Sequence, residues 1–327
     1  MKRLALVLLA AACSNNLHSG TPTPDASGSG SGSGSATPDA PTMASLSSIK
    51  TVVVLYAENR AFDNVYGSFP GANGLPVNGA YIPQLDRDGS QLATLPQTWT
   101  GVTAAGQTPV VTQMMSADLL NAPYSIEATY PGVDKTEITR DLYHRFYENQ
   151  MQIDGGYNDM FAAYADSGGL VMGHYDGSTM ALWQLAQQNT LADNWFMGAF
   201  GGSFLNHQYL ICACAPEYPN ADTATAKPTI AILDDDGNGG FLPELTLGSA
   251  SPASALDGPP TFALSGNVVP KNYFGDATFR AVNTMQPPYQ PSSTKAPAAD
   301  QTGMYVDPSS ATTLPPQTGM TIGDQLD

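Results

Sequence analysis

A serine preceded by two glycines is the first candidate for chemistry in this 327-residue chain. The apolar run that begins at Ser203, after Gly201 and Gly202, predicts a buried helix over residues 203–214. The first turn of a helix leaves backbone N–H groups unpaired, and these groups with the helix dipole attract anions. The glycines let a phosphate approach the backbone closely. Ser203 is therefore a candidate nucleophile toward phosphorus, and the alternative is that it serves only as an N-cap.

An acid–amide pair follows a strand pattern near the start of the folded part. Residues 49–56 are β-branched and almost continuously apolar, which predicts a strand buried on both faces of a parallel sheet. Glu58 and Asn59 come directly after it, at the carboxyl end where open α/β sheets bind ligands. Their oxygens suit a hard divalent cation. The alternative is a short helix starting at residues 60–63, with Glu58 stabilising its dipole.

These residues lie within blocks that resemble one family of phosphate-cleaving enzymes. The run Glu58-Asn59-Arg60-Ala61-Phe62-Asp63, followed by Tyr66-Gly67, resembles the E-N-R-S-F-D…G block of the bacterial acid phosphatase and phospholipase C phosphoesterase family. Further blocks are similar to its acid phosphatase branch and occur in the same order: residues 150–156, 198–210, 251–260 and 286–291. The resemblance covers residues 48–327, which is nearly all of the folded part.

The resemblance implies a fold and an activity. The fold is an α/β fold, an alkaline-phosphatase-like α/β/α sandwich with a mostly parallel central sheet. The activity is hydrolysis of phosphate monoesters of small phosphorylated substrates, through a serine nucleophile, a phosphoseryl intermediate and one divalent metal ion. Two alternatives stay open: phosphodiester cleavage of the phospholipase C type, and a non-catalytic, truncated surface lipoprotein.

The same resemblance assigns roles to single residues. The positions that match metal ligands are Glu58, Asn59 and Ser203, and Ser203 also matches the nucleophile. The residues expected to bind the substrate are His144, Asn206 and His207. His207 lies one helical turn after Ser203, and the alternative for it is a buried histidine that bonds within its own helix. His174 is expected to be structural or to lie at the rim of the pocket.

The chain departs from the family at its C-terminal end. In the family an acidic pair completes the metal site, in a block after the position that matches Asp327. A divalent cation takes about six oxygen donors, and the predicted groups here include a single carboxylate. We therefore expect the N-terminal part of the family domain, incomplete at the C-terminus, with weak metal binding and low activity. The acidic run at residues 234–239 is expected to form a turn, because Leu245 stands where a calcium loop needs its closing carboxylate.

The middle of the chain alternates predicted helices and strands. A helix is expected at residues 157–166. A second helix is expected after a cap at Ser178 or Thr179, with an apolar face made of Leu182, Leu185 and Ala186. Residues 191–197 are expected to form a strand, followed by a glycine-rich loop and the helix that begins at Ser203. This alternation favours a parallel sheet covered by helices.

The N-terminus predicts export. Residues 1–13 combine a basic start with an apolar run that is typical of a signal peptide and too short to span a bilayer. The junction at Cys13 resembles the lipobox of bacterial lipoproteins, which predicts a lipid anchor in the bacterial envelope, at the outer membrane; the alternative is periplasmic or secreted export. Residues 14–44 are a flexible Gly/Ser/Pro/Thr linker. The phosphoesterase domain is then expected at residues 45–327.

Charge and cysteine content restrict the partners. The chain has 12 Lys and Arg against 29 Asp and Glu, a net charge of −17, which repels nucleic-acid backbones. Cys212 and Cys214 are the cysteines after Cys13. Two residues apart on a helix, their side chains point to nearly opposite sides, so we expect buried free thiols and no disulfide between them.

Overall fold

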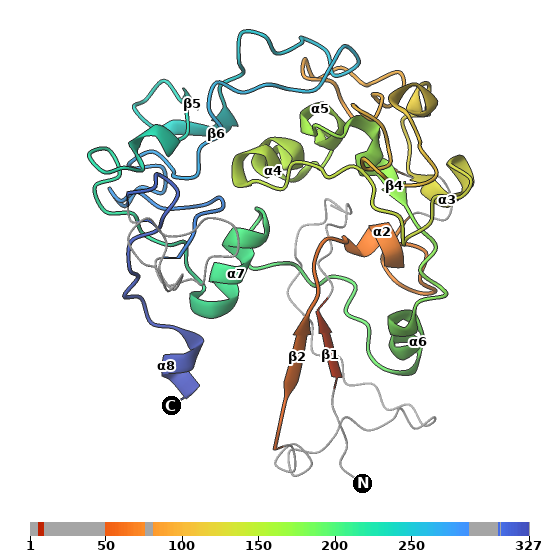
Figure 1. The fold of residues 1–327 in the computed structure, drawn as a ribbon, viewed down its shortest axis with the longest axis horizontal. Coiled ribbons are helices and arrows are strands. Elements are labelled where there is room, and N and C mark those ends of the chain that lie inside the picture. The colour runs from red at the N-terminus through yellow and green to blue at the C-terminus, as the bar shows by residue number, and fades with distance from the viewer. Residues whose placement is uncertain (1–5, 10–49, 76–80, 288–306, 308, 327) are drawn as a thin grey trace, which may run out of the picture.

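The computed structural model describes residues 6–9, 50–75, 81–287, 307 and 309–326 (Figure 1). The predicted lipidation site Cys13 and the predicted linker at residues 14–44 lie outside the described residues. The predicted signal segment is described only at Leu6–Leu9, which forms a strand.

The strands of the described chain form three small sheets of two strands each. The parallel pairs are β1 (Leu6–Leu9) with β2 (Val53–Tyr56), and β3 (Tyr124–Ser125) with β4 (Gly173–His174). β5 (Leu233–Asp235) and β6 (Phe241–Leu245) are antiparallel, joined by the acidic run. The α/β class is therefore confirmed, whereas the larger parallel sheet is not among the described strands and stays a prediction.

The helices are short and joined by long loops. The α-helices are α2 (Phe62–Tyr66), α3 (Ile126–Thr129), α4 (Phe146–Ile153), α5 (Phe161–Tyr164), α6 (Ala181–Gln188), α7 (Ser203–Cys212) and α8 (Ile322–Leu326). The 3₁₀ helices are η1 (Gln113–Ser116), η2 (Asp154–Gly156), η3 (Gly168–Met172) and η4 (Lys227–Thr229). The helix predicted at residues 157–166 is thus confirmed only over the four residues of α5.

Two buried clusters hold the elements of interest in place. The first joins α2 to α6 through Tyr66 and Trp183, whose rings stack with centroids 5.6 Å apart. The second contains Tyr147 of α4, Leu205 of α7 and Leu245 of β6. Burying these side chains together stabilises the packing of α4, α7 and β6 around one apolar core.

β2 is a strand, as predicted, but its expected burial on both faces is wrong. Val52 and Leu55 are 61% and 60% exposed. In Figure 1 the β1–β2 pair projects from the body between the sides that carry α6 and α7. A strand buries both faces only where helices cover the sheet, and β2 pairs with β1 alone among the described strands.

Two further predictions about the middle of the chain need correction. Residues 191–197 form no strand; the Asp193 carboxylate instead accepts a hydrogen bond of 2.7 Å from the backbone N–H of Asn73, which ties this segment to a loop. The predicted second helix exists as α6, with Met180 at its N-cap in place of Ser178 or Thr179. Of the predicted apolar face, Ala186 is buried as expected, whereas Leu182 and Leu185 are exposed and Trp183 is buried instead. The buried face of α6 therefore contains Trp183 and Ala186, and the stacking of Trp183 against α2 leaves Leu182 and Leu185 on the exposed side.

The prediction of free thiols at Cys212 and Cys214 is wrong. The two residues form a disulfide, with Cα atoms 5.2 Å apart. The prediction placed both on one helix, whereas α7 ends at Cys212 and Ala213 takes a left-handed conformation with φ of 50°. This turn places Cys214 outside the helix and within bridging distance of Cys212.

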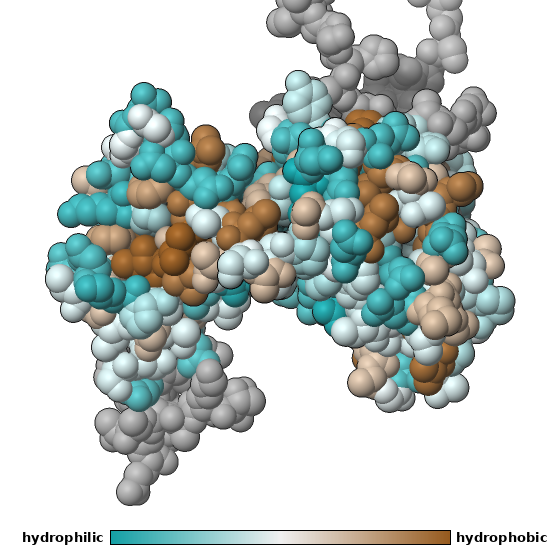
Figure 2. All heavy atoms as spheres, turned by 90° about the horizontal axis from the view of Figure 1, so that it is seen from above, coloured by the Kyte–Doolittle hydropathy of each residue, from teal (hydrophilic) through white to brown (hydrophobic). Residues whose placement is uncertain are grey.

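Hydrophobic residues reach the surface at several separate places among hydrophilic ones on the face shown in Figure 2. No helix in the described part of the chain has both the length and the hydropathy that crossing a membrane requires.

Candidate active site

α7 presents its first turn without a side-chain cap. Ser203 is its first residue, as predicted, and Gly202 occupies the N-cap position with no side chain bonded to the N–H groups there. Ser203 is half-buried, and its hydroxyl makes no hydrogen bond within the described chain. The predicted N-cap alternative is therefore not the role that Ser203 takes. This helix end offers N–H donors and the positive end of a dipole to an anion.

Gly202 lies directly against the segment that carries His144. A Cβ atom at residue 202 would stand 1.9 Å from the His144 carbonyl oxygen and 3.5 Å from Cδ2 of its ring. Glycine is therefore required at this close approach between two backbones. The His144 ring is 61% exposed, with Nδ1 2.8 Å from the carbonyl oxygen of Leu142. The contact brings His144 next to the first turn of α7.

Asn206 shapes the loop in front of α7. Its Nδ2 donates to the carbonyl oxygens of Gly201 and Gly202, both at 3.2 Å, and its Oδ1 accepts from the N–H of Ala199 at 3.2 Å. The residue is buried. These bonds hold the glycine-rich loop in the conformation that precedes Ser203, and a direct contact of Asn206 with substrate stays a prediction.

The end of β2 meets α7 one turn after Ser203. His207 Nε2 lies 2.5 Å from Glu58 Oε1, and the His207 ring packs against Tyr56 with centroids 5.6 Å apart. Burial and then the charge of Glu58 raise the pKa of Tyr56, so its hydroxyl stays neutral and donates to Met197 Sδ at 3.2 Å. His207 is 49% exposed and contacts Glu58 rather than its own helix. Residues four apart share a helix face, so Ser203 lies on the same side of α7 as this contact.

The chain turns sharply after Glu58. Asn59 has a left-handed backbone with φ of 70° and is exposed. Arg60 anchors the turn, because its guanidinium donates to Asn64 Oδ1 at 3.1 Å and lies 4.9 Å above the ring of Tyr175. The short helix considered as an alternative exists as α2, but it begins at Phe62, so Glu58 stands outside its first turn.

A cavity of about 240 Å³ lies between the starts of α4 and α7. Its wall includes His144 and Gly202, together with Phe204 and Asn283. Pockets for drug-sized ligands measure about 300–1,000 Å³, so this cavity suits a small molecule.

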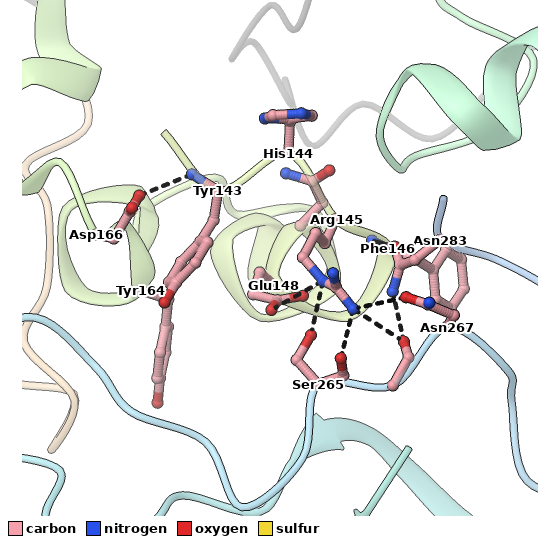
Figure 3. Close-up of polar contacts among 12 residues, drawn as sticks. Tyr143, His144, Arg145, Phe146, Glu148, Tyr164, Asp166, Ser265, Asn267 and Asn283 are labelled. Atoms are coloured by element: carbon pink, nitrogen blue, oxygen red, sulfur yellow. Dashed lines mark hydrogen bonds and ion pairs between the residues drawn. The ribbon is translucent and has the colours of Figure 1, made fainter. Parts of the chain in front are cut away.

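A second wall of the cavity carries charge. Asp166 accepts a hydrogen bond of 2.8 Å from the backbone N–H of Tyr143, and its other oxygen lies 3.1 Å from the Arg140 guanidinium. Burial, and then the charge of Asp166, raise the pKa of Tyr143. The Asp166 carboxylate is thus engaged by its own neighbours, and it holds Tyr143 in place beside His144 (Figure 3).

A comparison with family models decides the relationship of this chain to known proteins. The model of the phosphoesterase family matches residues 49–327. The chain belongs to the phosphoesterase family. Neither the comparison with curated proteins nor that with solved structures gave a match. Membership supports hydrolysis of phosphate esters, and the matched range contains the end of β2, the start of α7 and the cavity between the starts of α4 and α7.

Sequence reasoning missed several residues that line the cavity of this phosphoesterase: Arg145, Asp166 and Asn283. Arg145 carried a local signal, because it follows His144 directly and stands at the N-cap position of α4. Asn283 has no local signal in the sequence, because its position depends on a hydrogen bond that its Oδ1 accepts from the N–H of Phe146, far away in the chain, at 2.8 Å.

His174 lies apart from the cavity of the phosphoesterase. It belongs to β4 and is not among the residues that line the cavity. Burial lowers its pKa, and the charge of Glu127 opposes this shift. This placement agrees with the structural role expected for it.

The predicted metal ligands of the phosphoesterase fit a hard cation by type. Glu58 Oε1 is shielded from solvent and lies 2.5 Å from His207 Nε2, so this contact engages one carboxylate oxygen and leaves Oε2 as the oxygen for an ion. Carboxylate, amide and hydroxyl oxygens are the donors that such ions take. The described residues include no group of three or more His, Cys, Asp or Glu that could share an ion. Glu58 is thus the acidic donor that the described site provides.

Proposed function

We propose that this phosphoesterase hydrolyses phosphate monoesters with Ser203 as the nucleophile. The observation that carries the proposal is the uncapped first turn of α7, where the Ser203 hydroxyl accepts and donates no hydrogen bond among the described residues and Gly202, directly before it, contacts His144. A phosphate at this helix end would have its charge balanced by the dipole and its oxygens bound by backbone N–H groups.

The proposed reaction has two steps. Ser203 Oγ attacks phosphorus in line, the bond from phosphorus to the ester oxygen breaks, and the alcohol leaves with a proton taken from solvent as the serine proton is released. Water then attacks the phosphoseryl intermediate, returning the serine hydroxyl and releasing inorganic phosphate. Most of the rate enhancement would come from positioning and electrostatic stabilisation.

The neighbouring side chains would hold the phosphate in place. We assign His144 to a phosphate oxygen, because Gly202 brings it against the first turn of α7. Asn206 would act by fixing the carbonyl oxygens of Gly201 and Gly202, so that the N–H groups of the turn point toward the phosphate. His207 would bind the phosphate from the second turn of the helix, oriented by its contact with Glu58.

Glu58, Asn59 and Ser203 would hold one divalent metal ion. When bound, such an ion neutralises phosphate charge and lowers the pKa of a hydroxyl that coordinates it. The residues of the chain that prepare for it are Glu58, whose contact with His207 through Oε1 leaves Oε2 for the ion, and Asn59, whose turn follows directly.

The broader setting follows from the sequence. We propose an alkaline-phosphatase-like sandwich for the family domain, and export with a lipid anchor at Cys13. The substrate would then be a small phosphorylated molecule outside the cytoplasm.

The test is turnover of p-nitrophenyl phosphate, a monoester, against bis(p-nitrophenyl) phosphate, a diester, by the full-length chain. We expect faster monoester hydrolysis, and a loss of at least about a thousandfold in Ser203→Ala. Ser125→Ala is the matched control, because Ser125 caps α3 by accepting from the N–H of Ala128 at 3.2 Å. That change should cost about 1 kcal/mol of stability and no turnover. A preference for the diester would instead favour phospholipase C-type chemistry.

A further inference from the structure

Arg145 makes a concentrated set of contacts beside the proposed phosphate site. Its Nε donates to Ser265 Oγ at 2.9 Å, and its Nη2 donates to the carbonyl oxygens of Ser265 and Gly266 and to Asn267 Oδ1. Figure 3 shows the guanidinium turned toward residues 265–267, while the ring of His144 points the other way. Arg145 therefore ties the start of α4 to a distant loop.

A buried carboxylate faces this guanidinium. The Glu148 side chain is 1% exposed, and its Oε1 lies 3.7 Å from Arg145 Nε. Neither oxygen of Glu148 accepts a hydrogen bond within the described chain. A buried charge is stable only when it is paired, so Glu148 depends on Arg145 and keeps the guanidinium on this side of α4.

Asn283 joins the same loop to α4 from the opposite direction. Its Oδ1 accepts from the N–H of Phe146 at 2.8 Å, and its Nδ2 donates to the carbonyl oxygen of Gly266 at 2.7 Å. Arg145 and Asn283 both line the cavity with His144 and Gly202. The backbone at His144 is thus held by this network on one side and by Gly202 on the other.

We propose that Arg145 is a positioning residue for the hydrolysis. Through residues 265–267 it would fix His144 against the first turn of α7, and so set where the phosphate lies relative to Ser203. The inference rests on the proposed function, because it requires His144 and Ser203 to act on one phosphate. A guanidinium suits this role because its planar fork reaches several oxygen acceptors at once, whereas a lysine offers one compact charge.

The test compares Arg145→Lys with Arg87→Lys in the full chain. Arg87 is a matched control, because it also donates to backbone carbonyl oxygens, those of Pro252 at 2.5 Å and Gly258 at 2.8 Å, but does not line the cavity. The readouts are kcat for p-nitrophenyl phosphate and the Kd of inorganic phosphate by calorimetry. We expect Arg145→Lys to lower kcat and weaken phosphate binding on the order of tenfold each, and Arg87→Lys to leave both near wild type.

Wild-type kcat and phosphate Kd in Arg145→Lys, beside an inactive Ser203→Ala, would overturn this inference alone. Equal losses in the two arginine variants would also overturn it, since they would indicate only general stability. Full turnover in Ser203→Ala would overturn the proposed function and the inference with it. If Arg145→Lys does not fold, Ser265→Ala removes one acceptor and should show the same losses to a smaller extent; unchanged values there would contradict the proposal.

Discussion

The two sides of the candidate site are built differently. The α4–α7 side, made of His144, Arg145, Gly202, Asn206 and Asn283, is tied by hydrogen bonds and backbone contact to buried clusters. The β2 side, made of Tyr56, Glu58 and Asn59, belongs to an exposed strand and meets α7 through His207.

This difference indicates which part of the chemistry the described fold preorganises. The glycine-rich loop before Ser203 and the backbone at His144 are held in place before any ligand arrives, which favours electrostatic stabilisation without reorganisation. The carboxylate that would bind the metal is held by one contact to a half-exposed histidine. Changes on the α4–α7 side should therefore alter both stability and turnover, whereas changes on the β2 side should alter mainly metal binding.

Among changes that leave the nucleophile in place, the largest combined effect on stability and turnover is expected from Gly202→Ala, on the α4–α7 side. The new Cβ would stand 1.9 Å from the His144 carbonyl oxygen, so the two backbones must separate. We expect a loss of about 1–3 kcal/mol in the free energy of unfolding and a loss of turnover on the order of a hundredfold. Gly319→Ala is the control, since no described atom lies within 4 Å of the added Cβ. Equal turnover in both variants would mean that the close approach of Gly202 to His144 is not needed for catalysis.

Shortening one apolar side chain on each side should distinguish the two sides by the free energy of unfolding alone. Leu205→Ala on α7 empties a buried position and should cost about 3 kcal/mol, whereas Val54→Ala on β2 should cost under about 0.5 kcal/mol. Urea unfolding of both variants measures the difference. A cost of several kcal/mol at Val54 would mean that β2 is packed more tightly than its exposure indicates.

The stability of the protein should also depend on pH through Asp63 of α2, the helix that follows the β2 side in the chain. Burial raises the pKa of Asp63 from 3.8 to about 6. The folded protein then holds this proton more tightly than the unfolded chain, so the free energy of unfolding falls as pH rises through this interval, and the loss is complete above about 6.

Asp63→Asn should remove that fall, as followed by urea unfolding at several pH values. Asp88→Asn is the contrasting control, because hydrogen bonds from Ser90 lower the pKa of Asp88, which reverses the sign of its contribution. Identical pH profiles for wild type and Asp63→Asn would contradict the assignment.

A small effect on stability is expected from Glu58→Gln. The contact with His207 is partly exposed, and such pairs contribute about 0–1 kcal/mol. The same change removes the acidic donor from the proposed metal site. Calorimetric titration with a divalent cation should therefore show a larger loss in metal-binding free energy than urea unfolding shows in the free energy of unfolding. Unchanged metal binding in Glu58→Gln would place the metal elsewhere.

The sequence predicted the local features of the site well. The apolar run after Gly202 placed the start of α7 at Ser203, and the β-branched run placed β2 before Glu58. Both follow from patterns within a few residues, which determine where an element begins. The contact of His144 with Gly202 is a long-range contact, and the expectation for His144 came from family resemblance.

The errors arise where one residue or one distant partner decides the outcome. Ala213 takes a left-handed conformation that no periodicity indicates, and this single turn makes the disulfide of Cys212 and Cys214 possible. The apolar character of residues 49–56 predicts a buried strand, but burial depends on which elements cover it. Trp183 decides the buried face of α6 through contacts with α2 that the sequence of α6 does not contain.

Trapping of the covalent intermediate tests the central claim most directly. The full-length chain is mixed with p-nitrophenyl phosphate and a divalent cation, quenched with acid during turnover, digested and analysed by mass spectrometry. We expect the peptide that contains Ser203 to carry a phosphoryl group on Ser203, and the Ser203→Ala variant to carry none. Steady turnover with no phosphorylated Ser203, or with the phosphoryl group on another residue, would contradict the account.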